Sequence, residues 1–114
     1  MRKKYYTYIL LTKNNTLYCG YTDDVNRRFK THTEGKGAKY TKSNKPIKIV
    51  YQKAFNTKSE AMKEEYRIKK LTKKQKLEII SEYNKIHNHL LLLKIILVVL
   101  SFVFCLMTYY RYFS

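Results

Sequence analysis

The sequence predicts a small α+β protein, in which an antiparallel three-stranded sheet is flanked by helices and followed by one hydrophobic helix. Two β-rich runs, at 5–12 and 16–22, are separated by a short polar turn, as in a β-hairpin. A third β-rich run, at 47–51, follows a proline. From residue 90 onward the chain is almost uniformly apolar. These three observations predict a compact α+β domain with a separate transmembrane-type helix.

The first helix is expected directly after the hairpin. Thr22 or Asp23 can cap it, because both side chains accept hydrogen bonds from backbone N–H groups. Val25, Phe29 and His32 follow at helical spacing. This face is therefore expected to pack against the sheet, while the cations between these positions point outward.

Two further helices are expected after the third strand. Residues 57–60 read Thr-Lys-Ser-Glu and residues 72–75 read Thr-Lys-Lys-Gln, and both match the capping box that opens a helix. The segment 34–45, which contains glycine and several lysines, is expected to be a loop between the first helix and the third strand.

The composition indicates one folded, strongly basic domain. The chain has 114 residues and a net charge of +16, and 45% of its residues are hydrophobic. This hydrophobic content excludes a disordered basic tail. The two cysteines are too few for a disulfide scaffold or a multi-thiolate metal site. Residues 1–89 hold 22 of the 24 cations and all 8 acids, so this part alone carries +14.

The second part of the chain has the composition of a membrane segment. Residues 90–107 contain a single charge, Lys94, and are apolar on every side of a helix. Lysine can extend its ammonium group to the membrane surface, and tyrosines follow the apolar run, as at a lipid interface. We expect a transmembrane helix at about 90–110. The alternative is a hydrophobic helix buried in an oligomer.

These features divide the chain into a domain at 1–85 and a hydrophobic segment at 86–114, expected to be a membrane anchor. The positive-inside rule places the cation-rich domain in the cytoplasm. The domain would then be tethered to the inner face of the cell membrane.

The hairpin brings two tyrosines into one predicted surface. Strand alternation places Tyr8 on the same face of the first strand as Tyr6 and Leu10, and Tyr18 on the same face of the second as Gly20. Gly20 either leaves room for a ligand or a close backbone, or marks a β-bulge.

Helical spacing singles out an arginine and a glutamate. Arg28 borders the packed face of the first helix, whereas Arg27 lies on the far side. Glu65 falls near the centre of an apolar stripe on the next helix, where a carboxylate is costly unless a metal or cation meets it. The pattern alone slightly favours an i,i+4 ion pair with Lys69 over a metal site.

A run of cations with an interleaved tyrosine follows the first helix. Such residues offer contacts to phosphates and a stacking surface for bases, or they form a merely soluble face. The expected nucleic-acid-binding residues are Arg27, Lys36, Lys39, Tyr40, Lys42 and Lys45.

The order of these motifs resembles a known family. Tyr6-Thr7-Tyr8, a nine-residue spacer, Tyr18-Cys19-Gly20 and the stretch 24–32 are similar to the signature of the GIY-YIG nuclease superfamily. The likeness covers about residues 4–80. It is strongest to the small stand-alone bacterial type, which also resembles the nuclease domain of the structure-specific endonuclease catalytic subunit. The leading glycine and both isoleucines of the family's name are absent here.

The resemblance implies phosphodiester hydrolysis with one divalent metal, Mg²⁺ or another cation such as Mn²⁺. By this resemblance Tyr8 acts as general base or positions the attacking water, and Tyr18 is its companion at the same phosphate. Arg28 stabilises charge on the phosphoryl oxygens, and His32 lies where relatives place a histidine or tyrosine. Glu65 matches the metal-binding glutamate. Such chemistry depends on positioning and charge neutralisation rather than on a covalent nucleophile.

Three classes of function follow from the sequence. The first is a metal-dependent DNA endonuclease, with a structure-specific role in repair or recombination as the finer expectation. The second is a nucleic-acid-binding module of the same fold that does not cleave. The third is a membrane-bound basic protein whose charge serves anionic lipid. The joint presence of Tyr8, Tyr18, Arg28 and Glu65 favours the first class.

Overall fold

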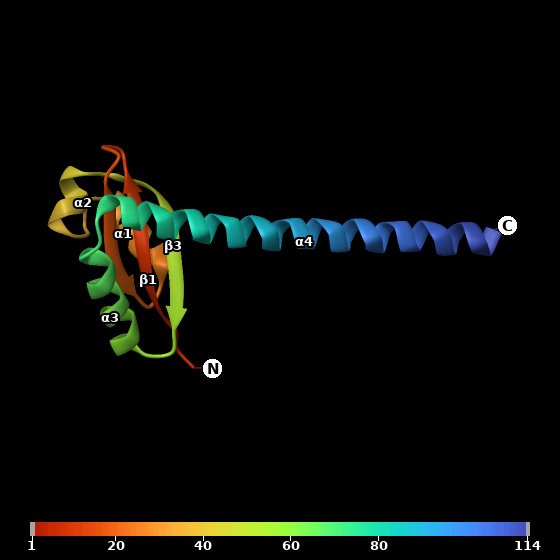
Figure 1. Ribbon diagram of the computed structural model, residues 1–114, viewed down its shortest axis with the longest axis horizontal. Coiled ribbons are helices and arrows are strands. Elements are labelled where there is room, and N and C mark those ends of the chain that lie inside the picture. The colour runs from red at the N-terminus through yellow and green to blue at the C-terminus, as the bar shows by residue number, and fades with distance from the viewer. Residues whose placement is uncertain (1, 114) are drawn as a thin grey trace. The chain divides into compact units, whose positions relative to one another are not determined.

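The computed structural model describes residues 2–113 as three strands and four helices (Figure 1). In chain order these elements are β1 (Tyr5–Thr12), β2 (Leu17–Thr22), α1 (Val25–Thr33), α2 (Lys39–Ser43), β3 (Pro46–Phe55), α3 (Lys58–Lys69) and α4 (Lys73–Phe113). The chain forms two units, Met1–Ile80 and Ser81–Ser114, and α4 contributes to both.

The three strands form one antiparallel sheet in the order β2-β1-β3, which confirms the predicted α+β fold. In the hairpin, Tyr8 lies opposite Gly20 and Leu10 lies opposite Tyr18, so the predicted shared face is present. The polar turn between β1 and β2 places Asn15 in the left-handed region, at φ 58°, a conformation that asparagine tolerates better than most residues.

The two faces of the sheet are covered by different helices. On one face Tyr8 and Leu10 pack against Val25 of α1. On the other face, which carries the alternate residues of β1, the Thr7 hydroxyl donates a hydrogen bond of 2.7 Å to the carbonyl oxygen of Ala61 in α3. The central strand β1 is therefore buried between α1 and α3, and side chains on it are held from both sides.

The helix starts agree with the sequence at two positions and differ at one. At α3 the Thr57 hydroxyl accepts the Glu60 N–H at 3.2 Å, and at α4 the side chains of Thr72 and Gln75 each accept the other's backbone N–H. The expectation for α1 was wrong, because Asp24 is its N-cap.

The shift of this cap by one residue has a local cause. Thr22 still belongs to β2, and its hydroxyl accepts the N–H of Asp24 at 3.2 Å. Asp23 is engaged in ion pairs with two cations. Asp24 is then the residue placed to accept the N–H of Arg27, at 3.1 Å.

The segment expected to be a loop contains the short helix α2. Its Thr41 is buried, with 1% of its surface exposed, while Lys39 and Lys42 are exposed. Five residues are too few to show a helical period in the sequence. This segment is therefore attached to the fold through one inward-facing hydroxyl.

The last helix, α4, runs for 41 residues without a break. Its most apolar window has a mean hydropathy of 3.0, and none of that window is buried within the structure. Among the helices described it is the one long and apolar enough to cross a membrane. The predicted long apolar C-terminal helix is thus present, and from residue 90 to 113 its large apolar side chains are exposed on every side.

Candidate active site

A cleft of about 400 Å³ lies where β1, β2, α1 and α3 meet. Four residues that the sequence singled out line it together: Tyr8, Tyr18, Arg28 and Glu65. The remaining lining residues are Gly20, Tyr21, Thr22, Arg27 and Thr31. The cleft thus combines three tyrosines, two arginines and one glutamate on elements that are distant in the sequence.

Gly20 is required by the tyrosine opposite to it. A Cβ atom on Gly20 would lie 2.5 Å from the hydroxyl oxygen of Tyr8 and 2.7 Å from its Cζ. Both strands keep a continuous register through this pair, so Gly20 does not mark a bulge. The space left by its missing side chain is used by the Tyr8 phenol, which can lie across β2 and reach the cleft.

His32 lies behind Tyr8 and joins it to α2. The hydroxyl oxygen of Tyr8 is 2.9 Å from Nε2 of His32, and Nδ1 of the same ring is 2.7 Å from Oγ1 of Thr41. The Thr41 hydroxyl also lies 2.9 Å from the carbonyl oxygen of Ala38, to which it can donate. All three side chains are buried, and together they form a continuous chain of hydrogen bonds from the cleft into α2.

Burial sets the protonation states along this chain. It lowers the pKa of His32 to about 4, and the nearby positive charge of Arg28 adds to the effect, so the imidazole is neutral at pH 7. Burial also raises the pKa of Tyr8, as does the neighbouring Tyr18, while Arg28 acts in the opposite direction. The Tyr8 phenol is therefore protonated at neutral pH and has a neutral imidazole as its partner.

Tyr18 is held among aromatic rings. Its ring centroid lies 5.0 Å from that of His32 in an edge-on contact, and 6.1 Å from that of Tyr40, with which it is stacked. Burial raises the pKa of Tyr18, so this phenol also stays protonated at pH 7. Tyr40 is part of α2, which therefore contacts the site through both Thr41 and Tyr40.

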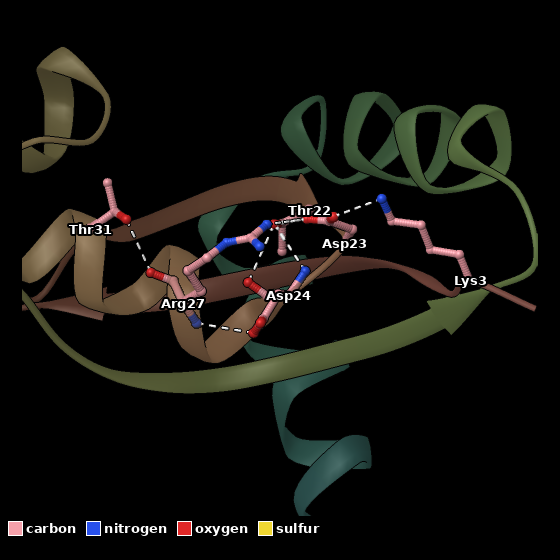
Figure 2. Close-up of polar contacts among 6 residues, drawn as sticks. All are labelled: Lys3, Thr22, Asp23, Asp24, Arg27 and Thr31. Atoms are coloured by element: carbon pink, nitrogen blue, oxygen red, sulfur yellow. Dashed lines mark hydrogen bonds and ion pairs between the residues drawn. The ribbon is translucent and has the colours of Figure 1, made fainter. Parts of the chain in front are cut away.

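The two arginines of α1 are less different than their helical positions suggested. Arg27 is exposed on the far side of α1, but it still lines the cleft together with the half-buried Arg28. Figure 2 shows Asp23 between the side chains of Arg27 and Lys3, and the Lys3 ammonium is 3.0 Å from the carboxylate. The charge of Arg27 at the cleft is thus partly neutralised by Asp23.

The ion pair that the sequence slightly favoured for Glu65 is present, and the same carboxylate lies at the cleft. It forms an i,i+4 ion pair with Lys69, and it also lines the cleft with only 15% of its side chain exposed. Within residues 2–113 no group of three His, Cys, Asp or Glu side chains could hold a metal. A zinc-type site therefore does not fit. A single carboxylate does fit Mg²⁺, which keeps several waters and binds substrate phosphates as further ligands.

The other predicted nucleic-acid contacts lie outside the cleft. Lys36, Lys39, Lys42 and Lys45 are exposed along the segment that contains α2. They do not line the cleft, but α2 reaches the site through Tyr40.

Sequence reasoning missed two residues that shape the site. Thr41 accepts or donates at Nδ1 of His32, and Gly37 lies so close to this ring that a Cβ atom on it would overlap Nδ1. The sequence placed Gly37 only in the segment 34–45, which was expected to be a loop after the first helix. Nothing in the spacing linked it, or Thr41, to a histidine in the preceding helix.

Comparisons with known proteins place this domain in a class of catalytic domains of nuclease type. The family model described as "GIY-YIG catalytic domain" matches residues 4–78. The chain therefore belongs to the GIY-YIG family, and the match includes every residue of the cleft.

Several bacterial relatives share this domain. UPF0213 protein SH2523 of Staphylococcus haemolyticus is 53% identical over 79 residues, which are 69% of this chain and 96% of the relative. UPF0213 protein RBAM_000440 of Bacillus velezensis is 50% identical over 78 residues, which are 68% of this chain and 79% of that relative. The solution NMR structure of protein EF2693 from E. faecalis is 40% identical, with a TM-score of 0.50, and the likeness covers 72% of this chain and 88% of that one.

Proposed function

We propose that this protein is a metal-dependent endonuclease that hydrolyses DNA phosphodiester bonds. The observation that carries the proposal is the single cleft lined by Tyr8, Tyr18, Arg28 and Glu65, in a domain of the GIY-YIG family. A cation and a carboxylate face the same cavity beside two phenols. This combination suits phosphoryl transfer, in which charge neutralisation and positioning of water supply most of the catalysis.

Tyr8 and His32 act as a proton relay in this proposal. A free phenolate at Tyr8 is unfavourable at neutral pH, because burial raises the pKa of this phenol. Tyr8 can still accept a proton from the attacking water if its own hydroxyl proton passes to Nε2 of His32, 2.9 Å away. The water oxygen then forms the new bond to phosphorus, the bond to the leaving oxygen breaks, and that oxygen takes a proton from solvent.

Arg28 and Glu65 manage charge in the same step. The Arg28 guanidinium lines the cleft, where it can donate hydrogen bonds to phosphoryl oxygens as their negative charge grows. Glu65 would hold a divalent cation, Mg²⁺ or Mn²⁺, which would supply further neutralisation at the phosphate. Lys69, its partner in the ion pair, would have to release the carboxylate when the cation binds.

DNA binding is assigned to the basic surface beside the cleft. Arg27 lies at the cleft itself, and four exposed lysines follow on the segment 36–45. These cations contact phosphates, and Tyr40, which is 41% exposed, offers a ring face to an unstacked base. Specificity for branched or flapped DNA, as in repair or recombination, is the finer part of the proposal.

The apolar helix is assigned to the membrane. We infer a domain at 1–85 in the cytoplasm and an anchor at 86–114, in which the apolar side chains of α4 contact lipid. This inference is based on an exposed apolar run of 18 residues, with the cations concentrated before it. DNA is present in the same compartment, so this placement is compatible with the proposed chemistry.

A cleavage assay tests the function. The full-length protein in detergent is mixed with flapped, branched and plain duplex DNA, each with Mg²⁺, with Mn²⁺ and with a chelator. We expect cleavage only with a divalent cation, and faster cleavage of flapped or branched substrates. Tight DNA binding without cleavage under every condition would instead identify a binding module of the same fold.

A further inference from the structure

The short helix α2 has one residue that faces inward to the site. Thr41 is 1% exposed and His32 is fully buried, and their side chains are 2.7 Å apart. The lysines on either side of Thr41 are exposed. The same five-residue helix thus carries part of the basic surface and contacts the proposed proton acceptor of the reaction.

The hydrogen bonds around His32 have a preferred direction. A neutral imidazole has one N–H and one acceptor nitrogen. If the hydrogen is on Nδ1, the ring donates to Thr41, Thr41 donates to the Ala38 carbonyl, and Tyr8 donates to Nε2, which gives three hydrogen bonds. If the hydrogen is on Nε2, Thr41 must turn its hydroxyl proton to the ring. Two bonds then remain, and the Tyr8 proton faces away from the ring.

Burial makes this difference important, because unmade hydrogen bonds cost most where water cannot replace them. In the Nδ1–H form the lone pair of Nε2 faces the Tyr8 hydroxyl, and Nε2 can accept the proton of this hydroxyl. The Nε2–H form places a hydrogen there, and His32 can then take no proton from Tyr8. The tautomer of His32 therefore decides whether the relay can operate.

We propose that Thr41 is a positioning residue that holds His32 in the Nδ1–H tautomer, so that Nε2 accepts the Tyr8 proton. The kinetic consequence rests on the proposed nuclease function, but the tautomer itself does not. A second observation supports the close approach: Gly37, which precedes α2, lies against the ring so tightly that a Cβ atom would overlap Nδ1. The segment that carries Thr41 is thereby held against the imidazole.

The direct test is the tautomer of His32 in solution. The full-length chain with ¹⁵N-labelled histidine is studied in detergent by long-range ¹H–¹⁵N correlation, which distinguishes Nδ1–H from Nε2–H. Substituting His87 and His89, both in the second unit, by glutamine leaves His32 as the only labelled ring. We expect Nδ1–H in this background and in T41S, which keeps the hydroxyl. In T41V, which has the same shape without it, we expect a shift to Nε2–H.

Cleavage gives the second readout. T41V should lower kcat roughly tenfold or more while DNA affinity stays unchanged, and T41S should remain within about threefold of the wild type. Melting curves of each variant show whether the fold is retained.

Each outcome bears on a separate part of the proposal. Detection of Nε2–H in the background with threonine at 41 overturns it, whatever T41V does, and so does an unchanged Nδ1–H population in folded T41V. A protein with the Nδ1–H ring that never cleaves DNA would refute the nuclease function and leave the positioning role of Thr41 intact. Equal loss of kcat in T41S and T41V would show that the hydroxyl is not what matters.

Discussion

The two units of this chain differ in how far their side chains are buried. In Met1–Ile80 a central strand is enclosed between helices, and its buried polar groups, such as Thr7, Tyr8 and His32, have hydrogen-bond partners. In Ser81–Ser114 the large apolar side chains are exposed on every side of one helix. The first unit supplies its own interior, whereas within residues 2–113 nothing buries the apolar window of the helix in the second unit. The predictions below test this difference, from the largest expected effect to the smallest.

The largest effect is expected on partition between membrane and water. The full-length protein should stay in the membrane pellet after washes with high salt and at alkaline pH, because a spanning helix is held by apolar burial rather than by charge. A chain ending at Lys85 should be soluble and folded, with the circular dichroism of an α+β protein. The 79 residues shared with UPF0213 protein SH2523 make up 96% of that relative, which supports independent folding of the domain.

Two outcomes would contradict this account. Release of the full-length chain by salt alone would indicate binding to anionic lipid through the basic domain. Recovery of the full-length chain as a soluble oligomer would instead show that the apolar helix is buried in an interface between copies of the chain. As a control, L97R/V98R in the middle of the apolar run should reduce the membrane fraction, since each arginine at the centre of a span costs about 2.5–3.5 kcal/mol.

The next effect concerns catalysis at the cleft. Arg28→Ala and Glu65→Gln should each lower cleavage by about 10²-fold or more, because each removes a charge that acts on the phosphate or its cation. Folding and DNA affinity should be largely retained. Arg27→Ala is the matched control: its guanidinium is exposed and paired with Asp23, so we expect weaker binding with kcat nearly intact. Equal losses of activity at the two arginines would remove the distinction between the faces of α1.

His32 should make the stability of the first unit depend on pH. Burial lowers its pKa in the folded state to about 4, from about 6.5 when unfolded, so the unfolded chain binds more protons between these values. The free energy of unfolding should therefore be greatest above pH 6.5. It should fall as the pH drops toward 4, by at most about 3 kcal/mol.

Urea unfolding of the 1–85 chain between pH 7.5 and 4.5 measures this slope, provided that the chain folds as expected above. His32→Gln should abolish most of it. Hydrogen bonds to Lys3 and Arg67 are the main cause that lowers the pKa values of Asp23 and Glu64. The contribution of these two carboxylates to the free energy of unfolding is therefore lost only at lower pH. A slope that persists in His32→Gln would show that another group titrates in this window.

How far the sequence could predict these features depends on the range of the contacts involved. The face shared by Tyr8 and Tyr18 could be predicted from alternation, because a period of two fixes which residues of a strand lie on the same side. The pairing of Tyr8 with Gly20 across the hairpin was not predicted and comes from the structure. The link from His32 to Thr41 could not be found in this way. It joins a helix to a five-residue helix that has no period of its own, and no residue type marks it.

Arg27 illustrates a different limit. Helical spacing gives the direction of Cβ, which for Arg27 is away from the packed face. A long side chain can still reach a nearby cavity, and Arg27 does line the cleft. The cap of α1 shows the same limit on a smaller scale, since three adjacent residues, Thr22 to Asp24, could all cap and only their other contacts select one.

A smaller effect is expected from substituting Gly20, the residue that lies opposite Tyr8 in the hairpin. Gly20→Ala should destabilise the first unit by about 1–3 kcal/mol and also impair cleavage, because the new Cβ atom would push the Tyr8 phenol from its position. Gly35→Ala is an instructive control. Gly35 has φ +75° and open space around it, so alanine there should cost about 1 kcal/mol through backbone strain without changing kcat. If Gly20→Ala retains full activity, the phenol is not held where the relay requires it.

The smallest effects are expected at the exposed lysines of the segment 36–45. If Lys39 and Lys42 each contact a phosphate, replacing either with alanine should weaken DNA binding a few-fold at low salt, and it should do so for every DNA sequence. The slope of log affinity against log salt should fall by about one for each contact removed. Lys74, an exposed lysine outside this segment, is the control, and Lys74→Ala should leave the slope unchanged. Equal reductions at all three positions would mean that DNA senses only the total charge of the domain, and the basic surface beside the cleft would lose its special role.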